Sequence, residues 1–281
     1  MPETVTRFAP SPTGLLHLGH VYAAKVARDL ARHDGGTFLL RFEDIDHTRT
    51  RPEYYRAMEE DLRWLGLDWD GEALRQSARV WAYDAALEQL KSLGAVYPCF
   101  CTRREIEDEV ARMTNAPHGP EGALYPGTCR RLPEEERQAK LASGAQPAWR
   151  LDAILAAEIA GPLDFRDLKH GIHPVNAGLL GDVVLARKDI GTSYHLAVVV
   201  DDAFQQVTHV TRGEDLLPST NVHRLLQALL GFPEPLYLHH TLVTDEKGVR
   251  LAKRHDALSV RHLRELGKTA ETILGMLPLS L

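Results

Sequence analysis

Short apolar runs alternate with polar loops along the N-terminal part of the chain. Residues 5–9 read Val-Thr-Arg-Phe-Ala, which predicts a short buried strand, and the proline-containing stretch 10–14 predicts a loop. Apolar residues then recur at helical spacing over 17–33, before a glycine pair ends the predicted helix. Residues 37–42 predict a second strand. This order indicates a βαβ unit of a parallel sheet, in which ligands bind beyond the carboxyl ends of the strands.

The remaining pattern predicts further elements around a segment of weaker periodicity. We expect helices over 52–65, 79–94 and 221–230, and strands over 196–200 and 206–212. The strand at 196–200 is predicted because Leu-Ala-Val-Val-Val is apolar throughout, as in a central strand of a parallel sheet. The segment 97–130 holds all the cysteines and several prolines, which predicts a small inserted lobe.

Composition limits the size, the compartment and the partners. The 281 residues are 44% hydrophobic, enough for one large domain or a domain with an inserted lobe. No apolar run approaches the ~20 residues that a membrane helix requires, and the N-terminal residues show no secretion signal. The odd number of cysteines, three, disfavours a disulfide framework and favours a reduced cytoplasmic protein. The net charge of −6 gives no global sign of nucleic-acid binding, although a local basic face would still permit it.

Two histidines and a glycine stand at the start of the first predicted helix. His17 and His20 are three residues apart and therefore share one helix face. A helix N-terminus attracts phosphate, and Gly19 leaves room near the backbone for a phosphate or a flat ring. Two imidazoles there would donate hydrogen bonds to a phosphate that gains charge in a transition state. Taken alone, the pattern is equally consistent with two surface histidines.

Residues 7–20 together resemble the first signature of class I aminoacyl-tRNA synthetases, in the form found in the glutamyl and glutaminyl branch. The signature reads His-Leu-Gly-His here, and Arg-Phe-Ala-Pro-Ser-Pro-Thr-Gly precedes it at 7–14. The resemblance implies an α/β fold with a Rossmann-type parallel sheet. It also implies that His17 and His20 are catalytic and, with Gly19, bind the ATP that reacts with an amino-acid carboxylate. Magnesium is expected with the ATP.

A basic stretch near the C-terminal end resembles the other signature of this family. That signature is often Lys-Met-Ser-Lys-Ser, and residues 250–254 read Arg-Leu-Ala-Lys-Arg. The resemblance implies that Arg250 and Lys253 bind ATP and that Lys253 is catalytic, because a cation beside departing pyrophosphate offsets its charge. Ala252 stands in place of the usual serine. Without the resemblance, a basic pentad is more commonly a solvated surface.

Three further segments resemble the glutamyl branch in particular. They are Arg-Phe-Glu-Asp-Ile-Asp-His-Thr-Arg at 41–49, the stretch 189–202, and Val-Thr-Arg-Gly-Glu-Asp-Leu-Leu at 210–217. The resemblance implies a glutamate site made by Arg7, Ala9, Ser11, Glu43, Tyr194 and Arg212. Arginine binds a carboxylate through two parallel hydrogen bonds, and Glu43 would pair with the α-ammonium group of the substrate. Each of these charged residues alone is more commonly part of a surface ion pair or an acidic turn.

The cysteines indicate a metal site in the predicted lobe. Cys99 and Cys101 lie two residues apart, Cys129 follows, and a structural zinc site requires four ligands. Tyr125 and His118 are the candidates for the fourth ligand. Short relatives of glutamyl-tRNA synthetase carry Cys-x-Cys followed by Tyr-x-x-x-Cys, so the resemblance favours structural zinc and Tyr125. Buried, reduced cysteines without metal are the alternative.

The resemblance covers residues 5–260 and predicts a domain organisation. We expect a discontinuous catalytic domain at 1–96 and 131–260, the zinc lobe at 97–130 and a short helical extension at 261–281. Only about 27 residues follow the basic pentad, so we expect no anticodon-binding domain.

These features are similar to those of the stand-alone paralogues of glutamyl-tRNA synthetase, the glutamyl-Q tRNA(Asp) synthetases. That family activates glutamate with ATP and attaches it to the queuosine base in the anticodon of tRNA(Asp). The implied partners are ATP, L-glutamate and queuosine-containing tRNA(Asp), with no membrane. Three alternatives stay open: a truncated glutamyl-tRNA synthetase core that charges tRNA(Glu), a non-catalytic tRNA-binding paralogue, and a simple nucleotidyltransferase. The last leaves the segments at 41–46 and 194–215 unexplained.

Overall fold

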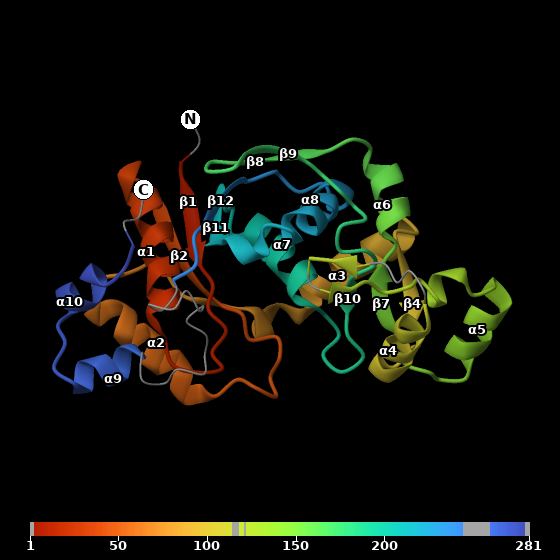
Figure 1. The fold of residues 1–281 in the computed structure, drawn as a ribbon, viewed down its shortest axis with the longest axis horizontal. Helices are drawn as coiled ribbons and strands as arrows, with labels where there is room; N and C mark the ends of the chain where they lie inside the picture. The colour runs from red at the N-terminus through yellow and green to blue at the C-terminus, as the bar shows by residue number, and fades with distance from the viewer. Residues whose placement is uncertain (1–2, 114–117, 121, 244–258, 279–281) are drawn as a thin grey trace.

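The computed structural model describes residues 3–113, 118–120, 122–243 and 259–278. Its N-terminal part is the βαβ unit that the sequence predicts (Figure 1). Strand β1 (Val5–Phe8) pairs in parallel with β2 (Thr37–Phe42), and helix α1 (Leu18–His33) connects them. The short strand β3 (Leu74–Arg75) extends this sheet beyond β2, again in parallel.

A second group of strands continues the sheet on the other side of β1. Strand β11 (His209–Gly213) lies beside β1, and a backbone hydrogen bond of 3.0 Å from Thr208 to Val5 links them. Beyond β11 the parallel strands β12 and β8 follow, and β9 is antiparallel to β8; their bounds are Leu236–His240, Asp164–Asp167 and Gly171–Pro174. Successive strands are therefore added away from β1 toward β2 and β3 on one side, and away from β11 toward β12 on the other, so the strand order reverses between β1 and β11. In open α/β sheets, ligands bind at this switch point.

Helices cover both sides of the sheet and form two large cores. On one side α1 packs with α2 (Pro52–Trp64), α9 (Val260–Glu265) and α10 (Ala270–Gly275), which lie together at one end of the molecule (Figure 1). Around the second core, helices α3, α7 and α8 pack on one another; they span Val80–Ser92, Tyr194–Phe204 and Ser219–Leu230. In the described part of the chain, no helix combines the length and the apolar character needed to cross a membrane.

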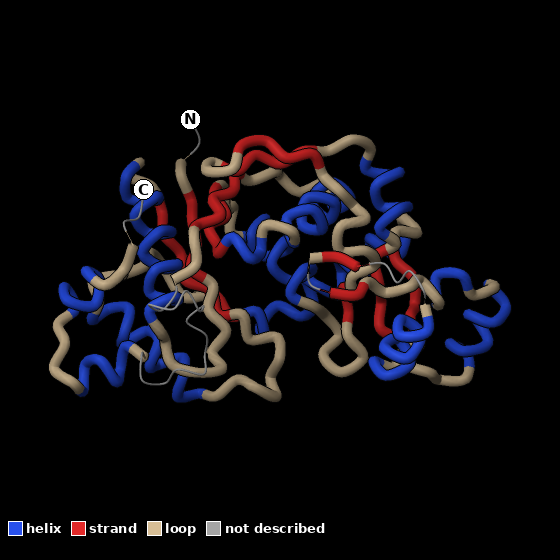
Figure 2. Tube along the Cα trace, in the orientation of Figure 1, coloured by secondary structure: helices blue, strands red, loops and turns tan. Residues whose placement is uncertain are grey.

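The cysteine-rich segment lies at the opposite end of the elongated molecule from α9 and α10 (Figures 1 and 2). Its strand β4 (Val96–Cys99) forms an antiparallel sheet with β7 (Ala148–Leu151) and β10 (Val184–Ala186). The adjacent helices α4 (Arg103–Arg112) and α5 (Glu134–Ala142) have no fully buried residue. The other short elements are α6 (Ala153–Ala160), β5 (His118–Gly119), β6 (Gly122–Ala123) and the 3-10 turns Gln76–Arg79, Cys129–Arg131 and Glu214–Leu216.

The prediction of a central strand at 196–200 is wrong, because these residues lie in helix α7. The run is apolar throughout because every one of its side chains is buried among the neighbouring helices. A short apolar run fits a buried strand and a buried helix equally well. The strand predicted at 206–212 is present as β11 but begins only at His209, and the helices predicted at 52–65, 79–94 and 221–230 are present.

Candidate active site

A cavity of 620 Å³ opens at the carboxyl ends of β1, β2 and β11, at the switch point of the sheet. Each of these strands brings a charged residue to it: Arg7 from β1, Glu43 directly after β2 and Arg212 from β11. Predicted site residues from five separate segments line this one cavity: Arg7, Ala9, Ser11, His17, Gly19, His20, Glu43, Tyr194 and Arg212. The predicted ATP-binding residues Arg250 and Lys253, with Ala252 between them, lie outside the described residues.

His17 and His20 line the cavity at the N-terminus of α1. His17 caps the helix, and its Nδ1 accepts a hydrogen bond from the Gly19 amide at 3.1 Å. His20 Nδ1 accepts one from the His17 amide at 3.4 Å, and the two rings stack with centroids 3.7 Å apart. Because each Nδ1 is an acceptor, each neutral ring carries its proton on Nε2. Two Nε2–H donors beside the positive end of a helix suit the binding of a phosphate.

A buried ion cluster holds Arg7 in place. Its Nε and Nη2 donate hydrogen bonds to the Asp202 carboxylate at 2.8 and 3.3 Å, and its Nη1 donates to the Thr211 carbonyl at 3.1 Å. Arg41 Nη1 donates to the same carboxylate at 2.8 Å. Although burial opposes ionisation, the guanidinium groups of Arg7 and Arg41 lower the pKa of Asp202 below its usual range. Arg7 is therefore a cation whose charge the protein already balances in part.

Glu43 is the carboxylate that faces the cavity from the end of β2. Its Oε1 lies 3.7 Å from Arg41 Nη2, and its amide donates to the Pro10 carbonyl at 3.0 Å, which fixes it against the loop after β1. Burial raises the pKa of Glu43 in spite of the nearby arginines. An ammonium group bound in the cavity would favour the ionised form of this side chain.

Arg212 has different partners from Arg7. Its guanidinium donates hydrogen bonds to His239, His223, Thr220 and Tyr194, all of them uncharged. Among the residues that the structure describes, no carboxylate lies close enough to form an ion pair with Arg212. The sequence predicts that Tyr194 shares a site with Arg212. It does not indicate His239, His223 and Thr220, because they come from β12 and α8 and meet the guanidinium only in the fold.

A second cavity of 350 Å³ adjoins the first and shares Ser11, Glu43 and Tyr194 with it. Its lining also includes Asp46, Arg49, Arg187 and His195. Burial and the Arg212 charge lower the pKa of His195 to about 4, so this imidazole is neutral at physiological pH. The two cavities are therefore neighbours that share part of their lining.

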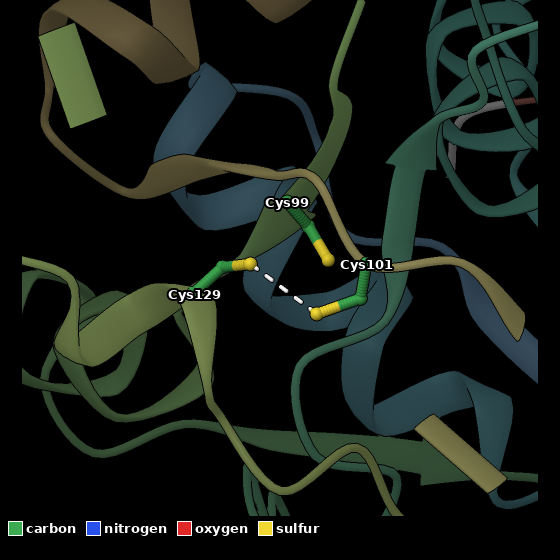
Figure 3. A group of neighbouring side chains, drawn as sticks. All are labelled: Cys99, Cys101 and Cys129. Atoms are coloured by element: carbon green, nitrogen blue, oxygen red, sulfur yellow. Dashed lines mark hydrogen bonds between the residues drawn. The ribbon is translucent and has the colours of Figure 1, made fainter. Parts of the chain in front are cut away.

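The cysteines converge at the end of β4, with their sulfur atoms directed toward one another (Figure 3). The Sγ atoms of Cys101 and Cys129 are 3.4 Å apart, and all three lie within 4.8 Å of one another. Tyr125 Oη lies 3.4 Å from Cys99 Sγ and 3.5 Å from Cys101 Sγ. The neighbouring Cys99 thiol lowers the pKa of Cys129, which favours the thiolate that binds metals.

Three sulfur atoms within 4.8 Å of one another suit zinc, and the Tyr125 hydroxyl beside two of them supplies the fourth donor that a tetrahedral site requires. The Phe100 amide donates a hydrogen bond to Cys129 Sγ at 3.3 Å and so orients this sulfur. The side chain of His118, the other candidate ligand, lies outside the described part of the chain.

Comparison with known proteins decides the family. The family described as "tRNA synthetases class I (E and Q), catalytic domain" matches residues 3–280. This chain belongs to that family. The resemblance that residues 7–20 first indicated is thereby confirmed, and so is the α/β fold with a parallel sheet.

Individual proteins are similar to this class I synthetase domain over nearly its whole length. A glutamyl-Q tRNA(Asp) synthetase of Rhodobacter capsulatus is 48% identical over 280 residues, which cover 98% of this chain and 100% of the relative. One from Symbiobacterium thermophilum is 46% identical over 281 residues, which cover 96% of this chain and 84% of the relative. The crystal structure of a glutamate tRNA ligase from Elizabethkingia meningosepticum in complex with its amino acid has a TM-score of 0.75 and 32% identity. That match covers 95% of this chain and 53% of the ligase, so this chain spans about half of it.

Proposed function

We propose that this synthetase domain activates glutamate with ATP and transfers it to the queuosine base in the anticodon of tRNA(Asp). The observation that carries the proposal is one cavity in which the uncompensated Arg212 guanidinium and the histidine-lined N-terminus of α1 face the same space. A carboxylate site and a phosphate site thus adjoin each other. Relatives at 46–48% identity that are named glutamyl-Q tRNA(Asp) synthetase support the choice of acceptor.

His17, Gly19 and His20 bind the ATP phosphates in this proposal, with Mg²⁺ accompanying the nucleotide. Arg250 and Lys253 neutralise the departing pyrophosphate, and Lys253 is catalytic. The described residues on either side of their segment support this assignment. Val243 lines the cavity, and Ser259 pairs with His17 in an isolated β-bridge. Val243 therefore lies at the cavity, and Ser259 lies beside it.

Arg7, Arg212 and Tyr194 bind the carboxylate of the glutamate side chain, and Glu43 binds its α-ammonium group beside Ala9 and Ser11. A substrate α-carboxylate oxygen then attacks the α-phosphate of ATP. A new P–O bond forms, the bond to pyrophosphate breaks, and glutamyl-adenylate results. No general base is required, because the attacking carboxylate is already ionised. The protein contributes positioning and charge stabilisation.

The second step transfers the glutamyl group to a hydroxyl of the modified base. The hydroxyl oxygen attacks the adenylate carbonyl carbon, AMP leaves, and the hydroxyl proton is released. The second cavity supports this step, since it shares Glu43 and Tyr194 with the first and so lies beside the proposed glutamate site.

We further propose that Cys99, Cys101, Tyr125 and Cys129 hold a structural zinc ion. It would tie the end of β4 to the turn at Cys129–Arg131, in a segment whose own buried cluster consists of Tyr97, Cys99 and Cys129. The zinc lobe at 97–130, the catalytic domain at 1–96 and 131–260, and the extension at 261–281 form the domain organisation of this proposal.

The decisive experiment measures pyrophosphate exchange against a panel of amino acids, with and without tRNA, followed by transfer of labelled glutamate. We expect exchange with glutamate in the absence of tRNA, and transfer to tRNA(Asp) that carries queuosine but not to unmodified tRNA(Asp). Exchange that requires tRNA(Glu), with charging of that tRNA, would instead indicate a truncated glutamyl-tRNA synthetase. Absence of exchange under all conditions would indicate a non-catalytic paralogue.

A further inference from the structure

Arg212 lies in a buried cluster of side chains from four elements. Arg212 itself comes from β11, His239 from β12, His223 and Thr220 from α8, and Asp167 from β8. The other four residues are each at most 3% exposed. These residues come from distant parts of the sequence and do not line the cavity themselves. Arg212 does line it, so the cluster supports the arginine from behind.

The hydrogen bonds around Arg212 fix the protonation of both histidines. Arg212 Nε donates to His239 Nε2 at 3.0 Å, and Arg212 Nη1 donates to His223 Nδ1 at 2.9 Å. A guanidinium group only donates hydrogen bonds, so each of these ring nitrogens must present a lone pair. His239 therefore carries its proton on Nδ1, and His223 carries its proton on Nε2.

Each of these protons has an acceptor that completes the arrangement. His239 Nδ1 donates to Asp167 Oδ2 at 2.7 Å, and His223 Nε2 donates to His195 Nδ1 at 3.1 Å. The Asp167 carboxylate also accepts three backbone amides, from Lys169 at 2.9 Å, His170 at 2.7 Å and His239 at 3.0 Å. These donors hold Asp167 as an anion that can only accept, so His239 cannot turn its proton toward Arg212.

The result is a buried cation with neutral partners. Thr220 Oγ1 accepts from Nη2 at 2.6 Å and Tyr194 Oη accepts from Nη1 at 3.4 Å, so four of the five guanidinium N–H groups have acceptors in the described structure. The fifth N–H, on Nη2, is left for a ligand. Arg7 shares the cavity but donates to the Asp202 carboxylate. A buried charge requires a counter-ion, and for Arg212 the cavity is where one can enter.

We propose that Asp167, acting through His239, is a positioning residue that keeps Arg212 an uncompensated cation aimed at the substrate carboxylate, and that His223 is a second such residue. This inference rests on the proposed function, in which glutamate is the substrate. A carboxylate in direct contact with Arg212 would neutralise it and compete with the substrate. Neutral imidazoles accept its hydrogen bonds without balancing its charge, which is left to the ligand.

The test replaces Asp167 with Asn, which keeps the size of the side chain. The Asn amide group would donate toward His239 Nδ1, force the ring proton onto Nε2 and set two donors face to face at Arg212. We expect Asp167→Asn to raise KM for glutamate about tenfold or more, with KM for ATP unchanged and kcat for pyrophosphate exchange within about threefold. Asp164→Asn is the matched control, because Asp164 is an exposed acid on the same strand.

A rescue variant shows whether Asp167→Asn raises KM through lost positioning of Arg212 or through a general loss of stability. In His239→Gln, the new side chain can present its amide oxygen to Arg212 without any help from Asp167. We therefore expect His239→Gln in the Asp167→Asn background to recover most of the glutamate KM. The single variant His239→Leu removes the acceptor for Arg212 Nε and should raise KM for glutamate as Asp167→Asn does, which keeps the proposal testable if Asp167→Asn does not fold.

The outcomes distinguish this inference from the function on which it rests. If the unaltered chain shows no glutamate-dependent exchange, the proposed function fails and so does this inference. If the unaltered chain activates glutamate but Asp167→Asn leaves its KM unchanged, only the positioning role is overturned. Equal losses in the KM values for glutamate and ATP, without rescue by His239→Gln, would also overturn it by indicating a merely structural effect.

Discussion

Two arginines of one cavity, Arg7 and Arg212, have opposite electrostatic surroundings. Arg7 shares the Asp202 carboxylate with Arg41, whereas Arg212 is held by imidazoles and hydroxyls. The first arrangement stabilises the fold, since it joins β1 and β2 to α7. The second leaves a charge available for chemistry. Both residues are arginine in the sequence, so only the fold shows which one depends on a ligand for its counter-ion.

Replacing the single residue Asp202 should therefore lower the stability of the fold. In Asp202→Asn, Arg7 and Arg41 would remain buried with their shared anion removed, and we expect the free energy of unfolding in urea to fall by about 3–5 kcal/mol. The control is Glu88→Gln, which removes an exposed ion pair with Lys91 and should cost less than about 1 kcal/mol. Similar losses for the two variants would show that the Asp202 cluster does not contribute in this way.

The prediction for Lys253 rests on its sequence motif alone. We expect Lys253→Ala to lower the rate of adenylate formation about 10²–10³-fold, because one cation beside the departing pyrophosphate is lost. Glutamate binding, measured by calorimetry without ATP, should stay within about twofold. Lys253→Arg keeps the charge and should retain most of the activity. Normal exchange kinetics in the alanine variant would remove Lys253 from the catalytic role.

At the scale of elements, the sequence pattern predicted where the strands β1 and β2 end, but it did not predict that residues 196–200 lie in a helix, α7. The βαβ pattern correctly indicated that residues after β1 and β2 would share one edge of a sheet, and Arg7 and Glu43 do line one cavity. Residues 196–200 are apolar because this part of α7 is buried on every side, which removes the periodicity that identifies a helix. Asp201 and Asp202 continue the same helix and bind arginines from other elements, so their role depends on contacts that no local pattern records.

The cysteine-rich segment gives a prediction at this same scale. Helices α4 and α5 have no fully buried residue, so little apolar packing holds the segment together without a metal. We expect purified protein to contain about one zinc per chain by elemental analysis. A strong chelator should make the α4–α5 region the first site of proteolysis, while Cys129→Ser should lower the zinc content before chelation. A metal-free protein with the same protease resistance would contradict the zinc site.

At the scale of the whole molecule, the two ends differ in character. One end holds the packed helices α1, α2, α9 and α10, and the other holds the small antiparallel sheet with the cysteines (Figure 1). The third cavity, near the cysteines, has both acids and cations in its lining, among them Glu105, Asp108, Arg112 and Lys140. The second cavity likewise combines Glu43 and Asp46 with Arg49 and Arg187, and Arg187 forms an ion pair with Asp46. Neither cavity therefore presents the one-signed basic surface that would by itself attract a polyanion.

The buried histidines around Arg212 give the whole molecule a predictable response to acid. Burial and the Arg212 charge lower the pKa of His239 to about 3, and the same two causes hold the pKa of His223 well below its usual range. In the unfolded chain both histidines titrate near ~6.5. Between about pH 6.5 and pH 4 the unfolded state therefore binds more protons than the folded state.

The sign of the effect follows from this difference. The stability that the neutral histidines contribute is fully present above about pH 6.5 and is lost as the pH falls toward their folded-state pKa values. We expect the free energy of unfolding, measured in urea at steps from pH 7 to pH 4.5, to fall by up to about 1.4 kcal/mol per pH unit for each histidine. His239→Gln removes one of the two and should reduce the slope by about one proton. His47→Gln, at an exposed histidine, is the control and should leave the slope unchanged. Equal slopes for the unaltered chain and both variants would mean that His239 is protonated in the fold and does not accept a hydrogen bond from Arg212.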